Sequence, residues 1–566
     1  MDARQHILEQ LVKKAGSGVK LEDIVESPVA DYGSPVAFKL AKSRGENPVK
    51  IAVELAASIQ PTSLIARVEA VNGYVNFHLD RAEYTRQFLG EFKGADYGRG
   101  SKKERIILEH TSVNPTGPVH VGRLRNSIIG DSLRRILVYA GYDVETHYYV
   151  NDIGRQIAII ALGIEEGIMP SSEVESEYPK YMGKKDFQMF AVYVPSFARF
   201  EEDGDFKARV QELIRRAESG DSSSLEKITN AAKDCLEGQL ESYSRMGISF
   251  NVFDYESDSI RDGSAFKVIG LAKASEHWVE EDFGSGLDLS SFGVEKKSGI
   301  SVLARSDGTT VYLTRDLAYH LAKEKIAGPK GRIINVLGED HKLEFRELKA
   351  ILEGILGFTG RLEPVHYSFV SFEGEKFSTR KGRIASIDVL LDEAVEKALQ
   401  EVRKREIADE SIAPLVGVGA VKFHIVKTQP NKQITFRWGE ALDFEGETAP
   451  YIQYAHARSC RMLEKAGEYD RENYSIDIEV DEEWALVKRL SSFPESVEKS
   501  AVELRPDVLA TYLLALTSEY GRFYMKCPVL DSADDVKSRR LLLVESVRDV
   551  VKAGLGLLGI DAPERM

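Results

Sequence analysis

A short loop in the first third of the chain carries residues that could bind a nucleotide. His120, Gly122 and Arg123 end the segment TSVNPTGPVHVGR, which follows an apolar run at residues 105–110. A glycine at a strand-to-helix turn lets the backbone approach a flat ligand, and the next helix offers unpaired N–H groups to phosphates. The same four-residue pattern is also typical of a tight turn with a structural histidine, so alone it defines no site.

A second loop, far downstream, is rich in basic and hydroxyl groups. Residues 375–383 include Lys376, Ser378, Thr379 and Arg380 and follow an apolar strand-like run. Such a loop can bind a polyphosphate and neutralise the charge that develops on it during reaction. An exposed basic turn is the simpler interpretation of this loop taken alone.

Composition excludes several other classes of protein. The chain has 566 residues, a net charge of −15 and three cysteines that are far apart, Cys235, Cys460 and Cys527. An acidic chain is a poor nonspecific coat for nucleic acid, and three scattered cysteines favour a reducing cytosol over a disulfide framework. No spacing of histidines and cysteines suits a zinc site, and no apolar stretch reaches 18 residues, so we expect no metal centre and no membrane span.

The two loops require an α/β framework to hold them. Residues 105–110, 124–140 and 143–150 predict strand, helix and strand, the first half of a doubly wound domain. The pattern resumes with strands at 332–338 and 365–372, separated by a helix that ends near residue 355. The acidic sequence between the two halves predicts mostly helix, and the sequence after residue 390 also predicts helix.

We therefore expect a multidomain α/β plus α protein whose Rossmann-type parallel-sheet core is split by an insertion. The hairpin signal Asn72-Gly73 indicates a separate α+β domain near the start. The expected segments are an N-terminal domain (1–98), the first half of the core (99–165), a mainly helical insertion (166–300), the second half of the core (301–390) and an all-α domain (391–566).

Together, HVGR and KFSTR resemble the HIGH and KMSKS signatures of class I aminoacyl-tRNA synthetases. The segments NPTGPVHVGRLRNSIIGDSL, TVYLTRDLAYH, KFSTRKG and ALDFEGETAPYIQYAHARS more specifically resemble arginyl-tRNA synthetases. This resemblance implies an arginine–tRNA ligase: arginine reacts with ATP to give arginyl-adenylate and pyrophosphate, and then passes to the 2′-hydroxyl of the 3′-terminal adenosine of tRNA(Arg). Neither step needs a protein nucleophile, because positioning and charge stabilisation can carry both.

The resemblance also assigns roles around ATP. It implies that His120, Gly122 and Arg123 hold ATP, that the KFSTR residues Lys376, Ser378, Thr379 and Arg380 grip its phosphates, and that Mg²⁺ accompanies the nucleotide. The chain departs from the signatures twice, because Arg123 replaces the last histidine of HIGH and Thr379 replaces the second lysine of KMSKS. Arg380, Lys381 or a basic residue near the first loop could supply the missing charge.

An arginine pocket needs acceptors at fixed positions, since guanidinium presents five donors in a planar fork. Tyr312 and Asp316 resemble the family's guanidinium-binding pair, and their spacing of four places them on one face of a helix. A helix cap for Asp316 and a packed strand position for Tyr312 are the simpler alternatives. Further pocket candidates, whose partner groups on the substrate stay open, are Glu109, Ser112, Asn114, Gln156 and His341.

The C-terminal helical segment resembles an anticodon-binding module, and residues 1–98 resemble the family's extra domain that contacts the tRNA elbow. Residues 411–439 contain no acidic residue, so basic side chains there could attract RNA. Core packing is an equally simple explanation for the tyrosines. The candidates for tRNA contact are Tyr451, Tyr454, His456, Arg458, Lys422, Lys427, Lys432 and Arg437.

Other functions remain open at this point. A class I synthetase for another amino acid would need a pocket without the Tyr312–Asp316 pair. A non-catalytic RNA-binding relative would explain Arg123 and Thr379, and a nucleotidyltransferase would leave the long helical segment without a purpose. We expect a cytoplasmic monomer whose partners are tRNA(Arg), L-arginine and ATP.

Overall fold

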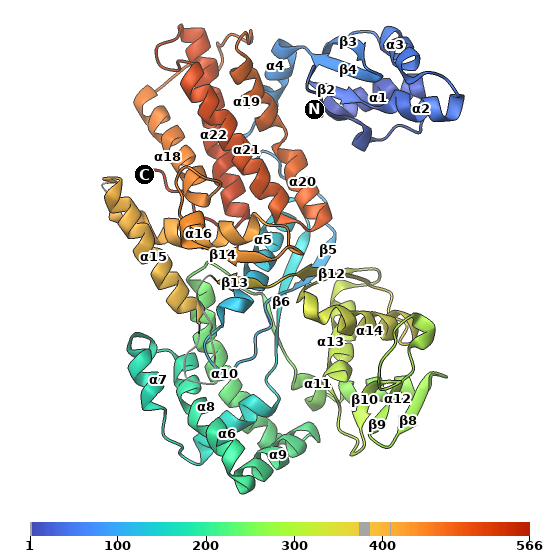
Figure 1. Cartoon of the computed structure of the whole chain (residues 1–566), viewed down its shortest axis with the longest axis vertical. Helices are drawn as coiled ribbons and strands as arrows, with labels where there is room; N and C mark the ends of the chain where they lie inside the picture. Colours follow the sequence, from blue (N-terminus) through green and yellow to red (C-terminus); the bar gives the residue numbers. More distant parts are fainter. Residues whose placement is uncertain (1–2, 373–384, 408) are drawn as a thin grey trace. The chain divides into compact units, whose positions relative to one another are not determined.

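The computed structural model describes residues 3–372, 385–407 and 409–566, which form two compact units (Figure 1). One unit comprises residues 98–458, 494–514 and 551–566, and the other comprises residues 1–97, 459–493 and 515–550. Within the described residues, no helix has the length and apolar character needed to cross a bilayer. We refer to the two parts as the core unit and the second unit.

The core unit is built on a five-stranded sheet in which every neighbouring pair is parallel, with strand order β12-β11-β5-β6-β7. The chain runs from β5 outward to β6 and β7, then returns to the other side of β5 for β11 and β12. This reversal makes the β5–β11 boundary the switch point where such sheets bind ligands. The strands are β5 (Arg105–Glu109), β6 (Asp143–Val150), β7 (Val252–Tyr255), β11 (Arg332–Gly338) and β12 (Arg361–Tyr367).

The sequence explains why β5 lies in the centre of this sheet. Ile106, Ile107 and Leu108 are fully buried, as expected for a parallel strand covered on both faces. The helix after it, α5 (Leu124–Tyr139), buries Leu124, Ile128 and the rest of its apolar stripe, as its periodicity predicts. The expected strand–loop–helix–strand order over residues 105–150 is confirmed.

The segment between the two halves is less purely helical than expected. Its helices pack around their own apolar cluster, and Figure 1 shows α6, α8, α9 and α10 together in one green lobe. However, the four-residue strand β7 lies inside the expected insertion and completes the main sheet beside β6. The helices are α6 (Arg155–Glu165), α7 (Ser172–Glu177), α8 (Lys185–Glu202), α9 (Gly204–Glu218), α10 (Ser222–Ser244), α11 (Asp258–Arg261) and α12 (Ser264–Lys273).

A small antiparallel sheet also belongs to this region, with strand order β10-β9-β8. Helix and Gly/Ser-rich spacers were expected there, because short strands of Gly-Ser sequence give little alternation of apolar and polar residues to detect. The strands are β8 (Trp278–Glu281), β9 (Gly284–Leu287) and β10 (Ser301–Arg305).

The second half of the core continues into helices. The strand predicted at 365–372 is broken at Ser368 and Phe369: β12 ends at Tyr367, and β13 (Val370–Phe372) pairs in parallel with β14 (Ile434–Phe436). The helix predicted to end near residue 355 is confirmed as α14 (Lys342–Gly354). The helices predicted after residue 390 are confirmed as α15 (Ile387–Lys404), α16 (Ala413–Val426) and α18 (Ala449–Ala466). The region also contains α13 (Tyr312–Ala327) and α17 (Trp438–Ala441).

The second unit joins the expected N-terminal α+β domain to C-terminal helices. Its sheet has the order β1-β2-β4-β3, and the predicted hairpin turns at Asn72 and Gly73, whose φ angles are 51° and 84°. Trp484 Nε1 and Lys488 Nζ each donate to Asp31 at 2.8 Å, which ties α19 to the small sheet. The strands are β1 (Val25–Glu26), β2 (Tyr32–Ser34), β3 (Ile65–Val71) and β4 (Tyr74–Leu79).

Four helices belong to the N-terminal part of the second unit, and the long C-terminal helices run through residues of both units. The first group is α1 (Ala3–Ala15), α2 (Val36–Arg44), α3 (Pro48–Ser58) and α4 (Arg81–Glu91). The second is α19 (Asp481–Ser491), α20 (Phe493–Glu503), α21 (Pro506–Lys526) and α22 (Asp534–Leu557).

Candidate active site

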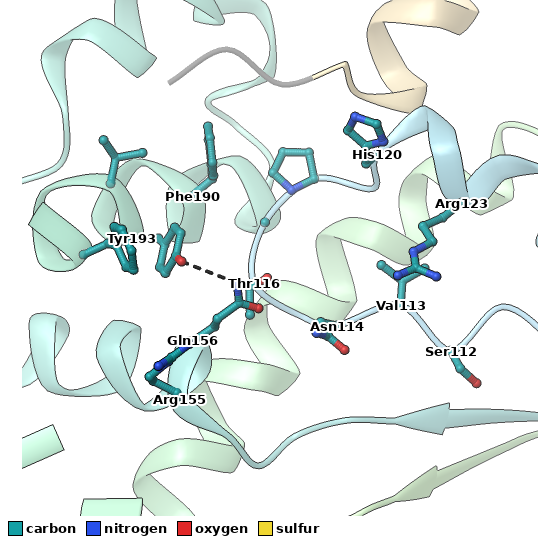
Figure 2. A pocket seen from close by; sticks show the side chains of 14 residues that line it. Ser112, Val113, Asn114, Thr116, His120, Arg123, Arg155, Gln156, Phe190 and Tyr193 are labelled. Carbon is teal, nitrogen blue, oxygen red and sulfur yellow. Dashed lines mark hydrogen bonds between the residues drawn. The ribbon is translucent and has the colours of Figure 1, made fainter. Parts of the chain in front are cut away.

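A cavity of about 460 Å³ opens where the loop after β5 faces the helices α6 and α8. Figure 2 shows His120 and Arg123 on one side and Phe190 and Tyr193 of α8 on the other. The cavity is lined by polar groups of the loop and by an apolar face of α8, which suits a ligand with both characters. A second cavity of about 220 Å³ shares the loop and α6 and adds Tyr312.

The HVGR turn holds its histidine in one tautomer. His120 Nδ1 accepts a hydrogen bond from the backbone N–H of Gly122 at 3.0 Å, which leaves Nε2 as the N–H donor of the neutral ring. Burial lowers the pKa of His120, and the nearby Arg123 cation lowers it further. His120 is therefore neutral at pH 7 and can donate to a nucleotide without a charge of its own, whereas Arg123 is exposed and charged.

Backbone hydrogen bonds connect this turn to the residues that follow the KFSTR sequence. Val121 N donates to Ala385 O at 2.8 Å, Ile387 N donates to Val119 O at 2.9 Å, and His120 forms a bridge with Ser386. The candidates Lys376, Ser378, Thr379 and Arg380 themselves lie outside the described residues. The KFSTR sequence is thus followed closely by a segment that is hydrogen-bonded to the HVGR turn.

The residues that precede KFSTR are held by a buried arginine. Arg125 Nη1 donates to the carbonyls of Ser368 and Lys432, both at 2.6 Å, and Nη2 donates to Gln429 O at 3.0 Å. Among the described residues no carboxylate is hydrogen-bonded to this fully buried guanidinium. Burial lowers the pKa of Arg125 to about 10, although the charge of Glu339 opposes the shift. Arg125 stays charged at pH 7 and ties the start of α5 to the segments that precede β13 and β14.

Tyr312 and Asp316 lie one turn apart on α13, so the predicted helical spacing is correct. Because α13 begins at Tyr312, Asp316 caps no helix end and Tyr312 lies in no strand, which removes both simpler alternatives. Tyr312 is 58% exposed and lines the smaller cavity. Asp316 Oδ1 lies 3.0 Å from His320 Nδ1. Burial would raise the pKa of Asp316, but interactions with His320 and Lys323 outweigh it and lower that pKa.

Glu109 ends β5 at the switch point. Its Oε2 atom accepts hydrogen bonds from Lys323 Nζ at 2.6 Å and from Asn335 Nδ2 at 2.7 Å. Its Oε1 atom is 3.4 Å from the Ser112 hydroxyl. Two donors from α13 and β11 therefore engage one carboxylate oxygen, while the other lies on the side of the loop that lines the cavity.

The backbone after Glu109 is strained. Thr111 and Ser112 have φ angles of 82° and 48°, in the left-handed region that β-branched residues avoid. Asn126 supports the turn, because its Oδ1 accepts from Thr111 N at 2.9 Å and its Nδ2 donates to Val336 O at 3.0 Å. Such strain persists only where surrounding contacts hold it, and it is concentrated at functional sites.

The remaining pocket candidates differ in position. Gln156 lines both cavities, and its Nε2 is 3.5 Å from the Tyr193 hydroxyl. Asn114 also lines both and accepts from Asn151 Nδ2 at 2.9 Å. His341 follows β11 and pairs with Glu344 at 2.5 Å, and it lines neither cavity.

Comparison with known proteins identifies the family. The family model described as "tRNA synthetases class I (R), catalytic domain" matches residues 92–438. The chain belongs to the arginyl-tRNA synthetase family. The models for the arginyl-tRNA synthetase N-terminal domain and the DALR anticodon-binding domain match residues 2–79 and 452–566.

Full-length relatives agree with this family assignment. The arginine–tRNA ligase of Methanocaldococcus jannaschii is 41% identical over 97% of this chain and 96% of its own. The arginine–tRNA ligase of Methanocella arvoryzae is 41% identical over 99% of this chain and 98% of its own. Among solved structures, the arginyl-tRNA synthetase of Thermus thermophilus is similar over 100% of both chains, with a TM-score of 0.82 and 29% identity.

Two of the tRNA-contact candidates in this arginyl-tRNA synthetase family member are buried. Lys422 donates to the carbonyls of Met246 and Gly559, and His456 Nδ1 donates to Pro563 O at 2.9 Å. Both side chains are inside the protein, so in this conformation neither reaches RNA. These two polar side chains form hydrogen bonds in the interior. Residue type alone could not distinguish this structural role from RNA contact at the surface.

The other candidates reach the surface to different extents. Tyr454 and Lys432 are exposed, and Tyr451, Arg458 and Lys427 are half-buried. The Arg458 guanidinium lies 4.8 Å from the Tyr454 ring centroid, and Lys427 Nζ donates to Glu447 O at 2.9 Å. The exposed Arg437 pairs with Glu440 at 2.9 Å.

Several residues near the site were not predicted. Lys323, His320, Asn335 and Arg125 are all buried and all contact polar groups of the site or its supports. The available signal was the repetition of polar residues at 316, 320 and 323 within an otherwise apolar helix face. Among the described residues, no group of three or more His, Cys, Asp or Glu side chains could hold a metal ion.

Proposed function

We propose that this chain activates L-arginine with ATP and transfers it to tRNA(Arg). The observation that carries the proposal is that two cavities share the loop after β5 and the start of α6. His120 and Arg123 of the HVGR turn line the larger cavity, and Tyr312, one turn from Asp316 on α13, lines the smaller one. A nucleotide-binding turn and a candidate guanidinium acceptor are therefore served by one loop. The family of the chain and the names of its relatives support the same reaction.

In the first step, the arginine carboxylate attacks the α-phosphate of ATP, the bond to the β-phosphate oxygen breaks, and pyrophosphate leaves. His120 Nε2–H and the Arg123 guanidinium would donate to the nucleotide as negative charge builds on it. We assign the phosphate grip to Lys376, Ser378, Thr379 and Arg380. Mg²⁺ would enter with ATP, bound chiefly by its phosphates.

In the second step, the 2′-hydroxyl of the terminal adenosine attacks the carbonyl carbon of arginyl-adenylate and AMP leaves. No protein nucleophile takes part, so catalysis depends on holding both reactants in place. Selection of arginine follows from charge and shape. A lysine ammonium cannot match the planar guanidinium fork, and a neutral analogue leaves pocket carboxylates unpaired, at a cost of several kcal/mol.

We propose that the helices around α18 contact the anticodon and that residues 1–98 contact the tRNA elbow. Tyr451, Tyr454, Arg458, Lys427, Lys432 and Arg437 remain the candidates for RNA contact. Aromatic side chains can stack on unpaired bases and basic side chains can contact phosphates. We also propose that the protein acts as a cytoplasmic monomer, which light scattering in solution would test.

The decisive experiment is ATP–pyrophosphate exchange with each amino acid in turn, with and without bulk tRNA. Exchange with arginine alone among the amino acids supports the proposal, and exchange with another amino acid refutes it. Asp316→Ala should abolish exchange with arginine. The matched control is Asp234→Ala, because Asp234 on α10 is half exposed and pairs with Lys185 at the surface. A folded protein that binds tRNA but shows no exchange would instead be a non-catalytic relative.

A further inference from the structure

We propose that Lys323 is a positioning residue for the arginine substrate: its buried ammonium orients both pocket carboxylates, Glu109 directly and Asp316 through His320. This inference deepens the proposed function and rests on it. Lys323 itself would not touch the substrate. It would act by fixing which carboxylate oxygens the pocket offers.

The environment of Lys323 indicates a specific role. The side chain is completely buried, and its ammonium lies 4.1 Å from the Tyr319 ring centroid, 2.6 Å from Glu109 Oε2 and 3.0 Å from His320 Nε2. Burying an ammonium group costs several kcal/mol, so an apolar residue of similar length would serve packing better. A lysine at this position is therefore best explained by the groups to which it donates.

The contacts fix the orientation of Glu109. Lys323 and Asn335 both donate to Oε2, from α13 and from β11 respectively. The carboxylate cannot rotate without losing two hydrogen bonds, one of them charge-assisted. Oε1 is consequently held on the side of Ser112, which lines the larger cavity.

The same ammonium reaches Asp316 through a relay. Asp316, His320 and Lys323 are spaced i, i+4 and i+7 on one face of α13. Because His320 Nε2 faces two donors, Lys323 Nζ at 3.0 Å and Asn335 Nδ2 at 3.2 Å, it must be the acceptor. Nδ1 then carries the proton. It donates to the backbone carbonyl of Asp316 at 2.9 Å and lies 3.0 Å from Asp316 Oδ1, so it engages the residue at two oxygens.

The charges of this cluster match a guanidinium. Two carboxylates and one ammonium leave a net charge of −1 around a neutral His320. The Lys323 cation pairs with Glu109 and also lowers the pKa of Asp316, whose side chain is 43% exposed. Lys323 thus offsets one carboxylate charge and leaves one negative charge for the substrate.

Further charged or titratable groups surround the cluster. His341, in the turn after β11, lowers the pKa of Asp316, and Glu256, paired with Arg315 at 2.5 Å, interacts electrostatically with Asp316. His147 of β6 lies between Glu145 at 3.0 Å and Asp254 of β7 at 2.6 Å, and Tyr319 donates to the same Asp254 at 2.9 Å. Tyr149 of β6 stacks on Tyr319 at 4.6 Å. These groups are paired with one another, which leaves Lys323 as the cation in direct contact with Glu109.

The test is steady-state tRNA charging with arginine varied, between about pH 6 and pH 8.5. For Lys323→Met we expect the KM for arginine to rise about tenfold or more and the KM for ATP to stay within about twofold. Removal of an opposite charge raises the pKa of a neighbouring carboxylate, so the arginine KM should also rise toward the acid end of this range. Lys323→Arg, which keeps the cation, should restore a flat pH profile.

The control is Lys325→Met, which removes an exposed lysine two residues along the same helix and should change neither KM. Asn335→Ser tests the inference if Lys323→Met does not fold, because it removes the second donor to Oε2. It should raise the arginine KM about threefold without making it depend on pH.

A folded Lys323→Met protein with an unchanged arginine KM and a flat pH profile would overturn the inference, as would a folded Asn335→Ser protein with parental arginine KM. The parent protein separates this failure from failure of the proposed function. If the parent does not charge tRNA with arginine, the function itself is wrong. If the parent charges tRNA and the variants match it, only the role of Lys323 is wrong.

Discussion

The buried guanidinium of Arg125 gives a sharp prediction about how the site is supported. Arg125→Met removes all three hydrogen bonds to the carbonyls of Ser368, Gln429 and Lys432. The contact with Ser368 is buried and the contacts with Gln429 and Lys432 are partly buried, so each acceptor left without a donor costs about 1–3 kcal/mol. The chain segments that carry them should therefore loosen in the variant.

Part of this loss is recovered, because methionine does not require a buried charge. Burial lowers the pKa of Arg125 from 12.5 to about 10, which corresponds to about 3 kcal/mol spent on keeping the cation inside. The net local destabilisation should then be about 3 kcal/mol. Since 1.4 kcal/mol is a factor of ten, amide hydrogen exchange should accelerate about 100-fold in β13 and β14.

The assay is hydrogen exchange followed by mass spectrometry on peptides that cover residues 366–372 and 429–437. Arg134→Met is the matched control, because Arg134 lies on the same helix, is a quarter exposed and pairs with the Asp131 carboxylate. Arg134→Met should leave the amide exchange rates in both peptides within about threefold of those in the parent protein. If Arg125→Met also stays within that range, the three contacts do not support these strands and the reasoning is refuted.

Three further outcomes follow from particular contacts. His147, held between two carboxylates, has a raised pKa in the folded state: burial alone would lower it, but the hydrogen bonds outweigh burial. The stabilisation from its charge is therefore complete below pH 6.5 and declines as the pH rises through the folded-state pKa. We expect His147→Gln to lower the melting temperature more at pH 6 than at pH 9. Equal losses at the two pH values would contradict this sign. Gly130→Ala would place a Cβ 2.2 Å from a buried histidine ring and should destabilise the folded protein by about 1–3 kcal/mol or more. Gly521→Ala has open space in mid-helix and should stabilise the protein by about 0.5–1 kcal/mol. Thermal melts of the two variants test the difference. Lys432→Ala should raise the KM for tRNA and reduce the slope of its salt dependence by about one released ion. Lys422→Met should lower the stability of the protein but leave that slope unchanged. A reduced slope for Lys422→Met would instead indicate that Lys422 contacts RNA directly.

The parts of the fold that the sequence predicts are those with local signals. The run Ile106–Leu108, the glycine-rich loop and the apolar stripe of α5 each meet a clear periodicity, and the Asn72-Gly73 turn needs positive φ angles that few residue pairs tolerate. The helical spacing of Tyr312 and Asp316 was predictable for the same reason. Local patterns of this kind depend on neighbours within a few residues.

The parts that escaped prediction depend on distant partners. The strand β7 gains its stability from pairing with β6, which lies about 100 residues earlier, and four half-buried residues give no pattern of their own. Lys323 looks like any basic residue near a helix end, and only its contact with Glu109, 214 residues earlier in the chain, shows its role in the interior. The same holds for Lys422, whose carbonyl partners lie 176 residues before it and 137 residues after it.

The discontinuity of the core unit has a consequence for biogenesis. Gln453 and His456 donate to the carbonyls of Asp561 and Pro563, 108 and 107 residues later in the chain. At ribosomal rates of about 5–20 residues per second, those acceptors emerge about 5–20 seconds after their donors. Gln453 can already donate to Leu415 O during this interval, but the buried His456 lacks its Pro563 acceptor, so this part of the core unit closes only after synthesis has passed residue 563. We expect this waiting period to be when the chain depends most on chaperones.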